Sequence, residues 1–180
     1  NPGFGTHITG STIGANGFDA TSTGNPSMFQ WNAGTQAWEP IPNTDNNTFF
    51  AGDAYAILIR GDRGTTLNSN TALGDPTVLR TTGEIHFGQF DVDDTNLSPA
   101  DNSNGIFSLV GNPYQSQVDL EVLLENHATD INNNVAYIYD PTLGDVGGYA
   151  TIDLENLNFS STPSGTSANQ YLQPNQAFFV

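Results

Sequence analysis

Short runs in which apolar residues alternate with polar ones recur along the chain, separated by turn residues. Two pairs of these runs are rich in aromatic residues. Met28–Trp31 and Ala37–Ile41 flank a polar link that contains a glycine, and Val135–Tyr139 and Tyr149–Leu154 flank a second link. A short polar link between two alternating runs is typical of a β-hairpin. The pattern therefore predicts two aromatic hairpins.

Further runs predict more strands, and one segment predicts a helix. The apolar residues after Gly105 predict a strand that stops at Gly111-Asn112-Pro113, because Pro113 lacks the N–H that a central strand needs. Ser116–Asn126 carries apolar residues four apart and predicts one short helix. Asn156–Asn169 is polar and predicts a loop. The other expected strands are Gly3–Gly10, Ala54–Ile59, Thr77–Thr81, Glu84–Phe90 and Tyr171–Val180.

We predict two related halves in the chain, because similar motifs follow one another in the same order in each half. In the hairpins, Trp31 matches Tyr139 and Trp38 matches Tyr149. The matched segments are residues 8–10 with 109–111, 18–19 with 118–119, 29–32 with 137–140, and 51–57 with 174–180. We therefore predict a first β pseudo-repeat over residues 1–104 and a second over residues 105–180.

The second half lacks counterparts of the later strands of the first half, so we expect it to be truncated at its C-terminal end, as in a fragment of a larger modular protein. The last apolar strand would then lack a neighbour. Because an unpaired apolar strand promotes aggregation, we expect this strand to be paired within the chain or with another chain. Its residues are the candidate assembly edge: Ala177, Phe178, Phe179 and Val180.

Composition narrows the fold class. Aromatic residues make up 11% of the chain, which also contains 19 glycines and no Lys or Cys. This composition favours short strands and many turns. We expect an all-β fold, an antiparallel, jelly-roll-like β-sandwich of two pseudo-repeated halves with at most one short helix.

The charge of the chain is strongly negative. It holds 3 Lys+Arg against 19 Asp+Glu, for a net charge of −16 at pH 7. Such a field repels phosphate groups, which argues against nucleic acid and anionic membranes as partners. No apolar run reaches the length of a membrane span, so we expect no membrane insertion.

Several motifs resemble a module of secreted and cell-surface proteins of flavobacteria and related Bacteroidota, which the type IX secretion system exports. The motifs are Gly17–Thr21, Asn25–Phe29, Ala54–Arg63, Ser108–Tyr114, Val135–Pro141 and Gln176–Val180. The resemblance implies an extracellular β-rich module of a large modular protein. It does not imply an enzyme, and the functions of the family include adhesins, surface filaments and enzyme-associated modules.

Acidic residues cluster in the connection between the two halves. Alternating Asp and Asn oxygens suit Ca²⁺, which takes six to eight oxygen ligands. The candidate ligands are Asp91, Asp93, Asp94, Asp101 and Asn104. Their spacing does not match an EF-hand, and the alternative is a solvated acidic linker. Apart from Ca²⁺, we expect no cofactor.

Two function classes remain open. The first is a non-catalytic structural or adhesive module that assembles through sheet edges with neighbouring domains or copies of the same protein. The second is a carbohydrate-binding accessory module of a secreted polysaccharide-degrading protein, with surface glycans stacked on Trp38, Trp31 and Tyr149. We identify no catalytic residues, because the chain lacks the sequence motifs of nucleophilic and nucleotide-dependent enzymes.

Overall fold

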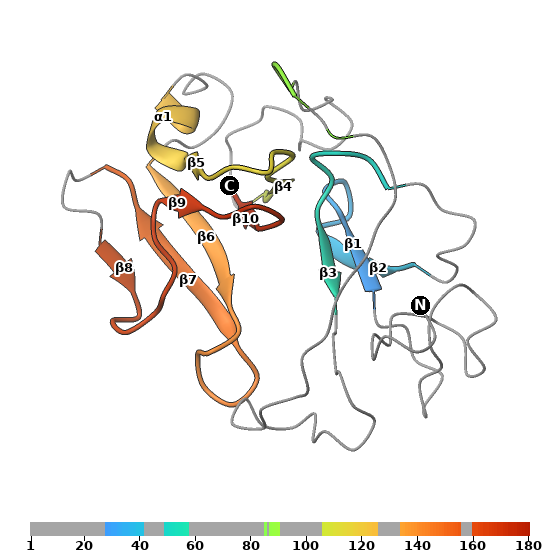
Figure 1. Ribbon diagram of the computed structural model, residues 1–180. Helices are drawn as coiled ribbons and strands as arrows, with labels where there is room; N and C mark the ends of the chain where they lie inside the picture. The colour runs from blue at the N-terminus through green and yellow to red at the C-terminus, as the bar shows by residue number, and fades with distance from the viewer. Residues whose placement is uncertain are drawn as a thin grey trace, which may run out of the picture. The chain divides into compact units, whose positions relative to one another are not determined.

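The computed structural model describes residues 28–41, 49–57, 85, 87–90, 106–125, 134–155 and 160–180 (Figure 1). These residues form antiparallel sheets and one short helix, which confirms the all-β prediction. The chain divides into two units. Unit 1 comprises residues 1–32, 37–50 and 55–84, and unit 2 comprises residues 33–36, 51–54 and 85–180. The predicted boundary between residues 104 and 105 stays a prediction.

Unit 1 contains a three-stranded sheet with the order β2-β1-β3. Its strands are β1 (Met28–Asn32), β2 (Ala37–Pro40) and β3 (Tyr55–Ile57). The β1–β2 pair confirms the first predicted hairpin, with Trp31 opposite Trp38. One face of this sheet carries a small core, formed by Met28, Ile41, Phe49, Tyr55 and Ile57.

Unit 2 contains a five-stranded sheet with the order β4-β10-β6-β7-β8 and a two-stranded sheet of β5 and β9. The β6–β7 pair confirms the second predicted hairpin. In chain order, the elements are β4 (Leu109–Gly111), β5 (Val118–Asp119), α1 (Leu120–Glu125), β6 (Val135–Asp140), β7 (Gly148–Asp153), β8 (Ser160–Thr162), β9 (Tyr171–Leu172) and β10 (Ala177–Phe179).

The core of unit 2 lies between one face of the five-stranded sheet and a layer made of α1, β5 and β9 (Figure 1). Ile138, Ile152 and Phe178 contribute from the sheet, and Leu120 and Leu172 contribute from the covering layer. Side chains alternate between the two faces of a strand, so the residues between these buried positions lie on the opposite face of the sheet. Several of them are aromatic, including Tyr137, Tyr139 and Tyr149.

The helix is shorter than the segment predicted from the sequence. It begins at Leu120, whereas Val118 lies in β5. The Asp119 carboxylate accepts a hydrogen bond from the N–H of Glu121 at 3.1 Å, which satisfies a donor of the first turn. A helix of six residues is unstable alone, and burial of Leu120 and Leu124 in the core stabilises it. This helix is too short to cross a membrane, and no other helix occurs in the described residues.

Three further predictions of secondary structure are wrong. The segment Tyr171–Val180 contains two strands in different sheets, because a turn with Asn175 at a φ of 61° separates β9 from β10. The predicted loop Asn156–Asn169 contains β8. In the predicted strand Glu84–Phe90, residues 85 and 87–90 form no strand. The predicted strands Gly3–Gly10 and Thr77–Thr81 lie outside the described residues, as does the end of the strand predicted over 54–59.

The central strands of the two units pair in the same register. Phe29 faces Pro40 and Ala56 in unit 1, and the matching Tyr137 faces Thr151 and Phe179 in unit 2. The turn before the closing strand also matches, since Gly52 and Asn175 occupy equivalent positions and both have a positive φ. The five residues of the unit 1 core correspond to Ala136, Ile152, Leu172, Phe178 and Val180 of the unit 2 core.

Candidate functional site

Asp140 is the one buried carboxylate among the described residues, with 1% of its surface exposed. It ends β6, directly before Pro141. Its Oδ1 accepts hydrogen bonds from the N–H of Thr142 at 2.8 Å and from the Thr142 hydroxyl at 2.6 Å. Its Oδ2 accepts bonds from the Thr166 hydroxyl, from the Ser167 N–H at 2.9 Å and from the Ser167 hydroxyl at 3.3 Å. A carboxylate offers about four lone-pair sites, so these donors occupy all of them.

These hydrogen bonds determine how Asp140 titrates. The Thr142 hydroxyl, followed by the Thr166 hydroxyl and the N–H groups of Thr142 and Ser167, holds the pKa of Asp140 well below its usual range, against the opposing effect of burial. Asp140 is therefore ionised at neutral pH. It joins the end of β6 to the loop before β9 and has no free lone pair for a metal ion or a substrate proton.

Asn112 has a similar structural role at the end of β4. Its side-chain amide donates to the carbonyl of Ser116 at 2.8 Å and to that of Gln173 at 3.1 Å, and its Oδ1 accepts from the N–H of Tyr114 at 2.9 Å. The adjacent Gly111 lies against residue 53, since a Cβ on Gly111 would come within 2.8 Å of the Asp53 carbonyl oxygen. The Gly-Asn-Pro motif is thus a tightly packed turn.

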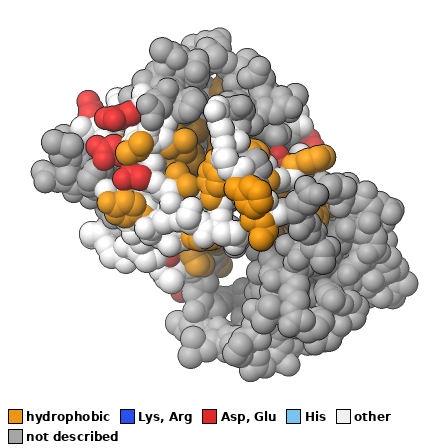
Figure 2. Space-filling model, turned by 45° about the horizontal axis from the view of Figure 1, so that its top comes forward, with side chains coloured by type: hydrophobic (Ala, Val, Ile, Leu, Met, Phe, Trp, Pro, Cys, Tyr) orange, Lys and Arg blue, Asp and Glu red, His pale blue; other side chains and the backbone are white. Residues whose placement is uncertain are grey.

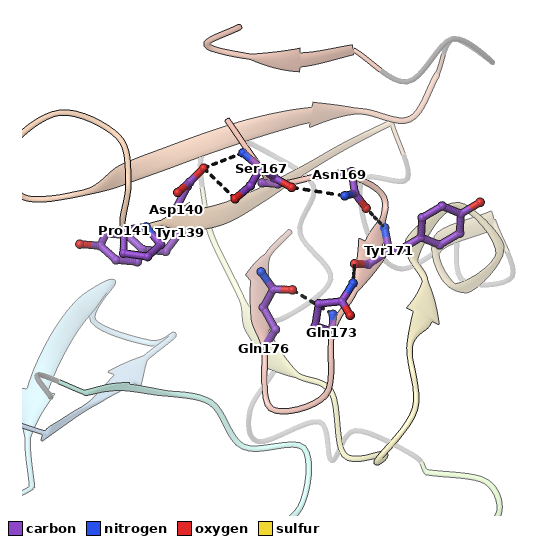
Figure 3. Close-up of a pocket in the computed structure, with 9 residues that line it drawn as sticks. Tyr139, Asp140, Pro141, Ser167, Asn169, Tyr171, Gln173 and Gln176 are labelled. Carbon is purple, nitrogen blue, oxygen red and sulfur yellow. Dashed lines mark hydrogen bonds between the residues drawn. The ribbon is translucent and has the colours of Figure 1, made fainter. Parts of the chain in front are cut away.

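A cavity of about 270 Å³ lies next to Asp140 in unit 2 (Figure 3). The lining residues are Tyr139, Asp140, Pro141, Ser167, Ala168, Asn169, Tyr171, Gln173 and Gln176. Most of the polar lining residues follow β8 in the sequence. The sequence pattern did not single them out, although the cluster of Asn and Gln between residues 169 and 176 is visible there.

The three predicted glycan-stacking residues belong to two units, and each ring packs edge-to-face on another ring of its own unit. Trp31 and Trp38 are cross-strand partners in unit 1, with ring centroids 5.3 Å apart and planes at 71°. Tyr149 lies in unit 2 and packs edge-to-face on Tyr139 and on Phe179, both with centroids 5.5 Å away. Burial, assisted by Tyr139, raises the pKa of the Tyr149 hydroxyl. Edge-to-face pairs across strands stabilise sheets, and they leave less ring face for a sugar.

The predicted Ca²⁺ ligands, Asp91, Asp93, Asp94, Asp101 and Asn104, all lie outside the described residues, so the calcium site stays a prediction. Within the described ranges, no three His, Asp or Glu side chains gather in a way that could hold a metal ion.

The predicted assembly edge, Ala177, Phe178, Phe179 and Val180, is not an edge of the sheet. β10 pairs with β4 on one side and with β6 on the other, so the backbone of Ala177–Phe179 is used within the chain. The expectation that this strand is paired is confirmed, and its partners lie in the same chain. Its position between β4 and β6 was not predicted, because both strands are distant from it in the sequence.

The outer side of β4 is covered within unit 2. The backbone N–H and C=O groups of Ser108, Val110 and Asn112 point toward β10. Those of Phe107, Leu109 and Gly111 therefore point to the other side of β4. The N–H of Gly111 donates to the carbonyl of Gly52 at 2.9 Å. The side-chain amide of Gln36 accepts from the N–H of Phe107 at 2.7 Å and donates to its carbonyl at 2.9 Å. The Gln36 side chain thus forms the two hydrogen bonds with Phe107 that the backbone of a neighbouring strand would form.

The other side of the sheet ends at β8 (Figure 1), whose only neighbouring strand among the described residues is β7. The N–H of Leu154 donates to the carbonyl of Asn134, so the backbone N–H and C=O groups of Ile152 and Leu154 point toward β6. Those of Thr151 and Asp153 point toward β8. Because Ile152 is opposite Ser161, the N–H and C=O of Ser161 point away from β7.

Comparison of the chain with protein-family models, with curated proteins and with solved structures found no match. The resemblance to exported modules of Bacteroidota therefore stays a prediction.

Proposed function

We propose that the chain is a non-catalytic structural and adhesive module of a secreted cell-surface protein or extracellular fibre, and that copies of it assemble through a sheet edge. The observation that carries this proposal is the difference between the two sides of the five-stranded sheet: Gln36 and Gly52 cover β4, whereas the outward backbone groups of β8 face no described strand.

An uncovered edge strand provides a row of N–H and C=O groups that can pair with a strand of another chain. β8 has three residues, Ser160-Ser161-Thr162, none of which is charged. A short edge supplies few hydrogen bonds, so the contact is weak and reversible, and repeated modules would be needed to add such contacts together. Pairing of two β8 strands around a two-fold axis would give an antiparallel, self-complementary contact.

The extracellular and non-catalytic parts of the proposal have separate support. The SLVGNPY and VAYIYDP motifs, on which the resemblance to exported modules rests, contain Asn112 and Asp140. Both residues use their side chains to hold turns, which is what a scaffold requires. The buried carboxylate that would be the first candidate for acid–base chemistry has no free lone pair.

We also infer that the two units arose by duplication of one β unit. The shared strand register, the two positive-φ turns and the five matching core positions support this inference, because strand composition alone does not fix which residues face each other. Duplication suits a module whose parent protein is built from repeats.

Substitution of Ser161 by proline tests the assembly. Proline removes the outward N–H and leaves the bonds of Ser160 and Thr162 to β7 in place, and edge strands tolerate proline at such positions. We expect sedimentation equilibrium to show self-association of the wild type and at least about tenfold weaker association of Ser161→Pro, since the loss of one or two hydrogen bonds is sufficient for this change.

Ser161→Ala is the matched control, because it removes the hydroxyl and keeps the N–H, and it should associate as the wild type does. Circular dichroism would verify that both variants remain folded. A wild type that stays monomeric into the millimolar range, or a folded Ser161→Pro variant that associates normally, would contradict the proposal.

A second candidate function, binding of carbohydrate, is favoured by one observation. The hairpin rings that were expected to stack on sugars pair with one another, but the cavity beside Asp140 is lined by amide and hydroxyl groups that a sugar could use.

A further inference from the structure

The cavity beside Asp140 offers polar groups without a net charge to bind a ligand. Asp140 is the charged residue in its lining, and five donors already surround its carboxylate oxygens. No Lys or Arg occurs in the described ranges, and the coloured side chains on the face shown in Figure 2 are apolar or acidic. Among the described residues, an anion would find no counter-charge here, and a cation would find no free lone pair on Asp140. The cavity therefore suits a neutral ligand.

Hydrogen-bonding groups of both kinds remain available in the cavity. The Oε1 of Gln176 accepts from the N–H of Gln173 at 2.9 Å, whereas its Nε2 donates to no described residue. In the view of Figure 3 the Gln176 side chain extends toward Ser167 across the cavity. The Nε2 of Gln173 donates to Tyr171, which leaves its Oε1 as an acceptor. A ligand that both donates and accepts hydrogen bonds matches this set, as a hydroxyl group does.

Pro141 and Ala168 supply apolar surface in the lining next to these polar groups. A sugar ring has both kinds of surface, hydroxyl groups at its rim and C–H groups on its faces. The volume of about 270 Å³ is below the roughly 300–1,000 Å³ of sites for drug-sized ligands, which limits the ligand to about one ring.

We propose that this cavity binds one neutral hexose residue of a glycan, with the Gln176 amide as donor to a sugar oxygen, Gln173 as acceptor, and Pro141 with Ala168 against the ring. The proposal rests on the second candidate function and names its site. Trp31, Trp38 and Tyr149 are not among the residues that line this cavity.

The test is a titration of the ¹⁵N-labelled chain with methyl glycosides of glucose, galactose and mannose, followed by amide chemical shifts. Glucuronic acid and glucosamine serve as charged probes. We expect saturable shifts confined to the cavity lining, with a Kd of the order of 1 mM for at least one neutral glycoside, and weaker binding of both charged sugars.

Gln176→Glu is the informative variant, because its carboxylate still accepts from Gln173 and cannot donate to the sugar. We expect at least a tenfold increase in Kd with an unchanged melting temperature. Gln115→Glu adds the same charge at an exposed residue outside the lining and should bind as the wild type does.

The outcomes separate the site from the function. A neutral glycoside that binds equally to Gln176→Glu would overturn this site and leave a carbohydrate-binding function with another site. Absence of saturable binding for all three neutral glycosides would overturn both. Tighter binding of a charged sugar would overturn the assignment of a neutral ligand.

Discussion

At the scale of single residues, the polar groups buried in unit 2 act as structural anchors. Asp140 and Asn112 both stand at the end of a strand, and both bond to residues that are distant in the sequence, Thr166 and Ser167 in one case and Gln173 in the other. Sequence reasoning identified the motifs that contain them and correctly predicted that a strand stops at Gly111-Asn112-Pro113, since β4 ends at Gly111. It could not find the partners of Asp140, because a separation of 26 or 27 residues leaves no local pattern.

The substitution Asp140→Asn should destabilise the chain. An amide can still accept from Thr142 through its oxygen, but its NH₂ group would face the N–H of Ser167, which leaves buried donors without acceptors. We expect a loss of about 1–3 kcal/mol in the free energy of unfolding, measured by urea denaturation at pH 7.

The pH dependence of the same variant provides a second readout. Because the folded pKa of Asp140 lies below its unfolded value, its carboxylate stabilises the wild type at neutral pH. This stabilisation is lost as the pH falls from about 4, the unfolded value, toward the lower folded value. The difference between the wild type and Asp140→Asn should therefore shrink below about pH 4. A constant difference down to pH 2 would contradict the role given to the charge.

At the scale of elements, the hairpins were predictable and the other pairings were not. β6 and β7 are joined by a short link, so their alternation and turn residues are local signals. β5 pairs with β9, which is far from it in the sequence, and β8 consists of two serines and a threonine within a polar segment. β5 and β8 have no apolar pattern of their own, so tertiary contacts rather than intrinsic propensity select these strands.

The hydrogen bonds between Gln36 and Phe107, which cover the outer side of β4, can be tested by substitution. Gln36→Gly removes the amide that bonds to Phe107, and glycine suits the φ of 52° at this position. We expect the variant to fold and to expose a second edge. In sedimentation, the double variant Gln36→Gly with Ser161→Pro should associate more strongly than Ser161→Pro alone.

The control for this prediction is Gln115→Gly in the Ser161→Pro background, since Gln115 is exposed and lies outside the sheet. Equal association of the two double variants would mean that Gln36 does not protect the edge.

At the scale of the whole molecule, charge and assembly oppose each other. Two copies that each carry a net charge of −16 repel at low salt, and this repulsion falls off within about 8 Å at physiological ionic strength. β8 itself carries no charge, so a contact limited to this strand is compatible with an acidic surface. Self-association through β8 should therefore strengthen as sodium chloride is added.

Hydrogen exchange of single amides, measured by NMR at low and high protein concentration in 0.15 M salt, tests assembly through β8 most directly. We expect exchange of the Ser161 amide to slow as the concentration rises, while exchange of the Phe107 and Gly111 amides, which are covered within the chain, stays constant. Unchanged exchange at Ser161 in a sample that demonstrably associates would contradict assembly through β8.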